Sequence, residues 1–99
     1  MLYDPKWEVT TEPWQQVLLD AASYIEQHGW VQFAYRDGEK ACAFAAIALS
    51  AATERDSYDA ESKMKRYLND NVQAWNDTKG RTQREVIDAL RKCAECTPS

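Results

Sequence analysis

Polar side chains that could bind a ligand gather in one short stretch of the chain, at Asn76, Asp77, Lys79 and Arg81. Amide and carboxylate groups supply hydrogen-bond donors and acceptors there, and an arginine guanidinium forms a fork that fits an anion. The stretch precedes a predicted helix, whose first turn offers free backbone N–H groups to an anion. With Trp75, which ends the preceding apolar stripe, we select Trp75, Asn76, Asp77 and Arg81 as the candidate ligand- or partner-binding residues.

The same stretch also has a purely structural interpretation, which we favour. Asn tolerates the left-handed backbone conformation, and Asp bonds to the backbone nearby, so both residue types are common in turns. We expect residues 76–80 to connect two helices, with Arg81 just outside the next helix cap and pointing outward.

Thiol and imidazole groups supply the other candidate chemistry. Cys93 and Cys96 form a C-x-x-C pair, but at the C-terminal end of a predicted helix, where the helix dipole disfavours a thiolate. Structural zinc takes two short ligand pairs and the chain has one, so we predict reduced cysteines, no metal and no cofactor. Cys42, near a helix start, could pair with His28 as nucleophile and base, or be a small core residue. With no orienting group identified, we assign no catalytic residue.

The spacing of the apolar residues predicts the elements that position these side chains. Apolar residues recur three and four positions apart, as expected for helices that bury one face. We therefore predict an all-α fold, a compact bundle of about four helices. The predicted helices cover residues 12–28, 40–52, 58–75 and 83–95.

The helix at 40–52 is rich in alanine and apolar on every side, which predicts that it is the buried central helix. Residues 53–57 form a charged loop in this interpretation. The aromatic segment 30–36 is predicted to be an extended connection, with a short strand as the alternative and residues 7–10 as its one weak partner. Asp37-Gly38 ends that segment in a turn.

Helix ends and chain ends carry local signals. Thr11 is a suitable N-cap for the first helix, and Gly29 is placed to end it in the left-handed conformation. Thr82 and Glu85 have the spacing of a capping box. We expect residues 1–10 to form an irregular arm and residues 97–99 to fray.

Composition limits the class of protein. The 99 residues predict one domain, 1–99, and the hydrophobic share of 44% with eleven aromatic residues argues against disorder. A net charge of -4 makes nucleic acid an unlikely partner, because phosphate binding depends on Lys and Arg. No segment has the roughly 20 apolar residues of a membrane helix, so we expect no membrane partner. The start lacks the features of a signal peptide, and with three cysteines we expect a cytoplasmic location.

Three segments together resemble a known family. They are the IEQHGW segment at residues 25–30, Cys42 opening an alanine-rich helix, and the segment WND followed by GRT and EVI at residues 75–87. The chain resembles, over about residues 14–95, a family of small bacterial and phage proteins of unknown function. The resemblance implies no activity and no catalytic residue.

Three functional interpretations remain open. The first, which we favour, is a small non-catalytic helical accessory protein that binds another protein or itself. The second is a small enzyme or ligand-binding domain that uses Cys42 with His28, or the turn from Asn76 to Arg81. The third is a nucleic-acid-associated protein that uses the basic residues of the last helix, which are Arg81, Arg84, Arg91 and Lys92. That helix also carries acids, so we rank this interpretation last.

Overall fold

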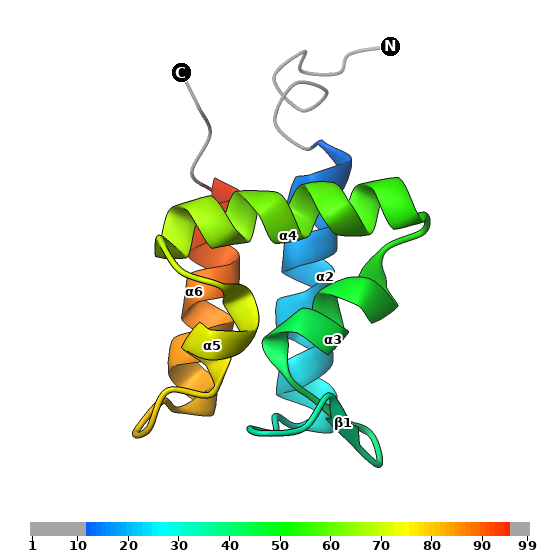
Figure 1. Ribbon diagram of the computed structural model, residues 1–99. Helices are drawn as coiled ribbons and strands as arrows, with labels where there is room; N and C mark the ends of the chain where they lie inside the picture. Colours follow the sequence, from blue (N-terminus) through cyan, green and yellow to red (C-terminus); the bar gives the residue numbers. More distant parts are fainter. Residues whose placement is uncertain (1–11, 96–99) are drawn as a thin grey trace, which may run out of the picture.

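Five helices and one short hairpin make up the part of the chain that the computed structural model describes, residues 12–95. Helices α2 (Pro13–His28) and α6 (Gln83–Glu95) pack side by side and run in opposite directions (Figure 1). Helix α4 (Glu54–Leu68) crosses both, and α3 (Ala43–Ser50) and α5 (Val72–Asn76) complete the packing. The N-cap of α2 is Glu12, so the cap predicted at Thr11 is wrong. The predicted arm at 1–10, Cys96 and the frayed end at 97–99 lie outside the described residues.

Helix α2 has the most extensive contacts with other helices and is the central element of the core, so the central position predicted for residues 40–52 is wrong, although Ala43, Ala45, Ala46 and Ile47 of that segment are buried as predicted. α2 packs against α3, α4 and α6, and its buried stripe faces all three helices. Its buried residues are Trp14, Gln15, Val17, Leu18, Ala21, Ala22 and Ile25. Ala21 and Ala22 have no solvent exposure, and their small side chains allow close approach of the neighbouring helices.

Both ends of α2 are tied down by hydrogen bonds. Gln15 Oε1 accepts from the Glu12 N–H at 2.7 Å, and its Nε2 donates to the Ala94 carbonyl on α6 at 2.8 Å. At the other end, the Gly29 N–H donates to the Ile25 carbonyl. Gly29 has a positive φ of 105°, which favours glycine, but its ψ of 166° lies outside the left-handed helical region, so the predicted left-handed cap is wrong.

A hairpin follows α2, formed by β1 (Arg36–Asp37) and β2 (Lys40–Ala41) in antiparallel register. The turn lies at Gly38 and Glu39, one residue later than the predicted Asp37-Gly38, because Asp37 pairs with Lys40 in the hairpin. Ala41 also forms a parallel bridge with Trp30, so the aromatic segment pairs with the chain just after it. Because Lys40 and Ala41 belong to this hairpin, α3 begins at Ala43, three residues later than the predicted start at 40.

The predicted helix 58–75 is in fact two helices. α4 begins earlier, at Glu54, because the Thr53 side chain accepts from the Asp56 N–H as an N-cap, so the predicted loop at 53–57 is wrong. α4 ends where Asn69 takes the left-handed conformation (φ 56°), and Asn71 then caps α5. After this break the short helix α5 packs against both α3 and α4.

Candidate functional site

Asn76, the last residue of α5, is fully buried and makes four hydrogen bonds with its side-chain amide. Its Oδ1 accepts from the Trp30 indole Nε1 at 2.6 Å and from the Ala43 backbone N–H at 2.9 Å. Its Nδ2 donates to the Val31 carbonyl at 3.2 Å and to Asp77 Oδ1 at 2.9 Å. The amide therefore uses all of its bonding capacity inside the protein, and it joins α5 to the start of α3 and to the segment after α2.

Asp77, the next residue, holds the same segment from a second side. Its Oδ1 accepts from the Phe33 backbone N–H at 2.9 Å, and its Oδ2 accepts from Gln73 Nε2 at 3.2 Å. Desolvation opposes ionisation of this carboxyl group. The hydrogen bonds from Phe33, Asn76 and Gln73 outweigh it and lower the pKa of Asp77 below its ordinary value of 3.8. The Asp77 carboxylate thus accepts hydrogen bonds both from α5 and from the segment that follows α2.

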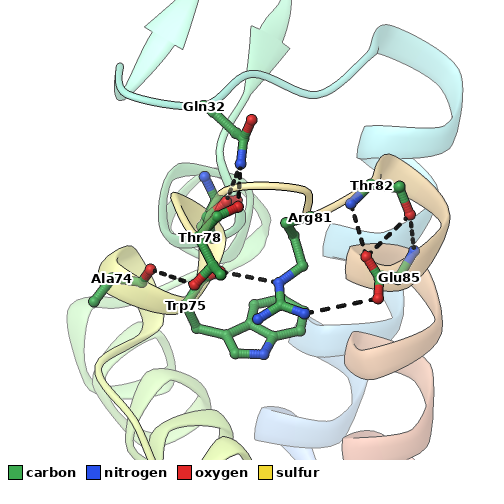
Figure 2. Close-up of polar contacts among 8 residues, drawn as sticks. Gln32, Ala74, Trp75, Thr78, Arg81, Thr82 and Glu85 are labelled. Carbon is green, nitrogen blue, oxygen red and sulfur yellow. Dashed lines mark hydrogen bonds and ion pairs between the residues drawn. The ribbon is translucent and has the colours of Figure 1, made fainter.

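Trp75 and Arg81 form a stacked pair on the outer side of this turn (Figure 2). The Arg81 guanidinium carbon lies 3.9 Å from the centre of the Trp75 ring, and Arg81 Nε donates to the Trp75 carbonyl at 3.0 Å. Arg81 Nη1 is 3.7 Å from Glu85 Oε2, and the arginine side chain is only 19% exposed. The expectation that Arg81 points outward is therefore wrong: cation–π attraction and hydrogen bonding fold it back onto Trp75.

The predicted capping box is confirmed beside this pair. The Glu85 N–H donates to the Thr82 hydroxyl at 3.2 Å, and the Thr82 N–H donates to Glu85 Oε1 at 2.9 Å (Figure 2). Glu85 therefore has two roles, because one carboxylate oxygen caps α6 and the other faces Arg81. The turn is fixed to the first turn of the last helix through this residue.

The structure brings Trp75, Asn76, Asp77 and Arg81 together, as the sequence predicts, but it directs their polar groups into the protein. Asn76 and Asp77 hold the segment at residues 31–35, which we name the presenting loop, while Arg81 bonds to Trp75 and faces Glu85 within the turn itself. Gln32 adds to this attachment, because its Nε2 donates to the Asn76 carbonyl at 3.1 Å and to the Thr78 carbonyl at 2.9 Å (Figure 2). The turn from α5 to α6 is the support for the loop.

Phe33 occupies the most unusual position in the presenting loop. It has a φ of 63°, a left-handed conformation that costs a residue other than glycine about 1–3 kcal/mol. Its side chain is 73% exposed, so burial of the ring offsets little of that cost. The hydrogen bond from its N–H to the Asp77 carboxylate contributes about 1.5–3 kcal/mol, as bonds to charged groups do. The free-energy cost of the left-handed backbone and the contribution of the hydrogen bond are therefore of similar size.

Two further aromatic side chains are exposed, Tyr35 in the same loop as Phe33 and Phe44 on α3. Tyr35 is two residues further along the presenting loop, and its ring meets that of Phe44 edge to face, with 6.0 Å between ring centres. Tyr35 is 49% and Phe44 38% exposed. We name Phe33, Tyr35 and Phe44 the aromatic surface. The sequence predicted an extended connection or a short strand at residues 30–36, and the alternation of Val31, Phe33 and Tyr35 with smaller or polar residues gave no signal that the two aromatic rings are exposed.

Cys42 and His28 do not pair with each other. The Cys42 Sγ accepts from the Ala45 N–H at 3.3 Å as the N-cap of α3, and it lies 3.5 Å from Gln73 Oε1. Desolvation raises the pKa of this buried thiol despite the hydrogen bond from Ala45. His28 instead bonds through Nδ1 to Glu39 Oε1 at 2.9 Å. These environments do not favour a nucleophile activated by a base.

Metal ligands and basic residues take other roles in the described part of the chain. Across residues 12–95, no group of three His, Cys, Asp or Glu side chains is placed to hold a metal ion. On α6, Arg84 lies near Glu26 and Asp88, and Arg91 Nη2 is 2.8 Å from Glu26 Oε1. These ion pairs neutralise much of the charge on which nucleic-acid binding through the last helix would depend.

One open surface pocket, of about 470 Å³, lies at the junction of α4 and α5. Its lining residues are Ser62, Lys65, Arg66, Asn69, Asp70 and Asn71. Neither Cys42, His28 nor the turn at 75–81 contributes to it. A deep pocket near Cys42 would have favoured an enzyme, and this pocket lies elsewhere.

Comparison with known proteins identifies the family of the chain without a function. A model of the family of unknown function DUF6197 matches residues 9–95, and the chain belongs to this family. No curated protein matches the chain, and no solved structure matches it. Among the described helices, none has the length and apolar character needed to cross a membrane.

Proposed function

We propose that the protein is a small non-catalytic accessory protein that binds another protein through the aromatic surface of Phe33, Tyr35 and Phe44. The observation that carries this proposal is the exposure of Phe33 in a left-handed conformation. A glycine or asparagine would occupy this position at lower cost, so stability of the fold does not explain a phenylalanine there. Strained backbone of this kind clusters at functional sites.

The support beneath the loop agrees with a binding role. Asn76, Asp77 and Gln32 hold the presenting loop through hydrogen bonds between segments more than 40 residues apart in the chain. A loop fixed in advance loses less conformational entropy when it binds a partner. Exposed aromatic side chains on a fixed support are typical of the residues that contribute most to protein interfaces.

The proposal includes a location. We propose that the protein acts in the cytoplasm of a bacterium or of a phage-infected bacterial cell. The buried Cys42 thiol, which is hydrogen-bonded and without a disulfide, suits a reducing compartment.

Site-specific photo-crosslinking tests the binding role. A photoreactive phenylalanine analogue is placed at position 33 in one variant and at position 58 in a control, because Tyr58 on α4 is 69% exposed and lies outside the aromatic surface. In extracts of the cell that encodes the protein, we expect one partner to crosslink from position 33 and not from position 58. The same adducts from both positions, or none from position 33, would contradict the proposal.

The purified partner then allows a quantitative test. Phe33→Asn keeps a residue that tolerates the left-handed conformation and removes the ring, and we expect it to weaken binding at least about 30-fold, as loss of a central interface residue does. Tyr58→Ser, the control, should leave the affinity unchanged. If position 33 crosslinks only to a second copy of the chain, sedimentation at several concentrations should show a dimer that Phe33→Asn dissociates, and the surface is then a self-association site.

A further inference from the structure

We infer that the presenting loop is a two-state device, in which the Asp77 carboxylate latches Phe33 in its left-handed conformation and loss of this hydrogen bond releases it. The inference concerns the free protein and does not depend on the proposed partner. It rests on the geometry of the loop, on the exposure of the Phe33 ring and on the separate attachments of the flanking residues.

The latched state depends on a single contact that opposes a single strained angle. Phe33 has a φ of 63°, and its largely exposed ring gains little from packing. Its N–H donates to Asp77 Oδ1 at 2.9 Å. Without that acceptor, the backbone of Phe33 relaxes to a negative φ, where a residue with a side chain is more stable.

The carboxylate is fixed independently of the loop it latches. Asn76 Nδ2 donates to Asp77 Oδ1 at 2.9 Å, and Gln73 Nε2 donates to Asp77 Oδ2 at 3.2 Å. Both donors belong to α5. The acceptor therefore stays in place when Phe33 leaves it, and the latch can close again.

The flanking attachments confine the change to the middle of the loop. On one side, Asn76 donates to the Val31 carbonyl and Gln32 donates to two carbonyls of the turn. On the other side, the Tyr35 carbonyl accepts from the Cys42 N–H at 3.1 Å. None of these bonds involves Phe33 or Ala34, so release reorients the Phe33 ring while the rest of the fold is retained.

Amide hydrogen exchange at residue 33, followed by NMR on the full chain, tests the latch. Phe33→Ala removes the ring and keeps the strain, whereas Phe33→Gly removes both. After correction for intrinsic exchange rates, we expect the amide of the glycine variant to be about tenfold better protected than that of the alanine variant. Equal protection in the two variants would overturn the inference, because no strain would then oppose the closed state.

Asp77→Ala tests the other half of the device. We expect protection at the Phe33 amide to fall about tenfold or more, while the Trp30 indole and the Cys42 amide keep the wild-type protection. Unchanged protection at Phe33 would show that Asp77 is not the latch. If Asp77→Ala fails to fold, the comparison of Phe33→Ala with Phe33→Gly decides, since both leave Asp77 intact.

Discussion

The Asp77 carboxylate accepts hydrogen bonds from the Phe33 N–H and from the side-chain amides of Asn76 and Gln73. The lowering of the pKa by these bonds is larger than its increase by desolvation, so the pKa of Asp77 in the folded state is below 3.8. A group whose pKa is lowered by folding stabilises the fold above its unfolded pKa, and this contribution is lost as the pH falls through the folded pKa.

Asp77→Asn should therefore be less stable than wild type by about 1–2 kcal/mol near neutral pH. We expect the difference in free energy of unfolding to shrink as the pH falls below about 4, because the wild-type carboxyl then takes up a proton and the variant amide does not. Urea denaturation of both proteins across this range measures it. All other acids titrate equally in the two proteins, so a difference that stays constant with pH would contradict the assignment.

Arg81 differs most between the sequence prediction and the structure. As an outward-pointing residue it would contribute almost nothing to stability. Arg81 is stacked on Trp75 and bonded to its carbonyl, so Arg81→Ala should lower the free energy of unfolding by about 1 kcal/mol. Arg81→Lys keeps the charge but loses the planar stack, and we expect it to recover only part of the loss in thermal melting. If Arg81→Ala leaves the melting temperature unchanged, the result would support the outward orientation that the sequence predicted.

Cys42 is predicted to be unreactive in the folded protein. It is buried, it caps α3, and desolvation raises the pKa of its thiol. Because the thiolate is the reactive form, alkylation by iodoacetamide near pH 7 should be about 100-fold slower than in urea-unfolded protein. Peptide mapping by mass spectrometry gives the rate for Cys42 alone. Modification as fast as in the unfolded chain would favour the nucleophile interpretation.

At the scale of elements, Asn76 connects three segments that are distant in sequence. Asn76→Ala leaves the Trp30 indole N–H and the Ala43 N–H without their acceptor, and we expect a loss of about 2–4 kcal/mol. Asn76→Asp is the matched variant, since it keeps the shape and the acceptors but places a carboxylate oxygen against the Val31 carbonyl and Asp77. It should be at least as unstable near neutral pH. Chemical denaturation that shows a loss below about 1 kcal/mol for both variants would contradict the role of Asn76 as a connector.

The sequence predicted which segments are helical better than it predicted the residues at which the helices begin and end. The capping box at Thr82 and Glu85 placed the start of α6 correctly, because all of its bonds lie within one helical turn. The break between α4 and α5 was missed, although Asn69 and Asn71 are suited to end one helix and cap the next. The stripe from Met64 to Trp75 keeps a helical spacing across that break, and this spacing concealed it.

The candidate site was predicted by position but not by role. The sequence indicated that Trp75, Asn76, Asp77 and Arg81 share one turn, because neighbours in sequence must lie near one another. What Asn76 and Asp77 bond to depends on Trp30, Val31 and Phe33, which are more than 40 residues away. No local pattern encodes that pairing, and the left-handed φ of Phe33 follows from it rather than from the residue type.

At the scale of the whole molecule, an apolar sequence does not ensure that every side of a helix is buried. The segment of α3 is more apolar than that of α2, and each of the two helices packs on at least three others, yet α3 is not covered on every side. α3 leaves Phe44 and Leu49 exposed, at 38% and 44%. An apolar helix with an open side is consistent with the aromatic surface lying partly on α3, since large exposed apolar side chains mark sites of interaction.

A pair of aspartate substitutions on α3 separates its two sides. Ala45 has no exposure and belongs to the core, whereas Ala48 is partly exposed. Ala45→Asp should lower the free energy of unfolding by about 3 kcal/mol or more, because it buries a charge without a partner. Ala48→Asp should cost less than about 1 kcal/mol beyond the small difference in helix propensity. Denaturation of both variants in urea makes the comparison within one helix, and equal losses would mean that α3 is buried on every side, as its composition alone suggests.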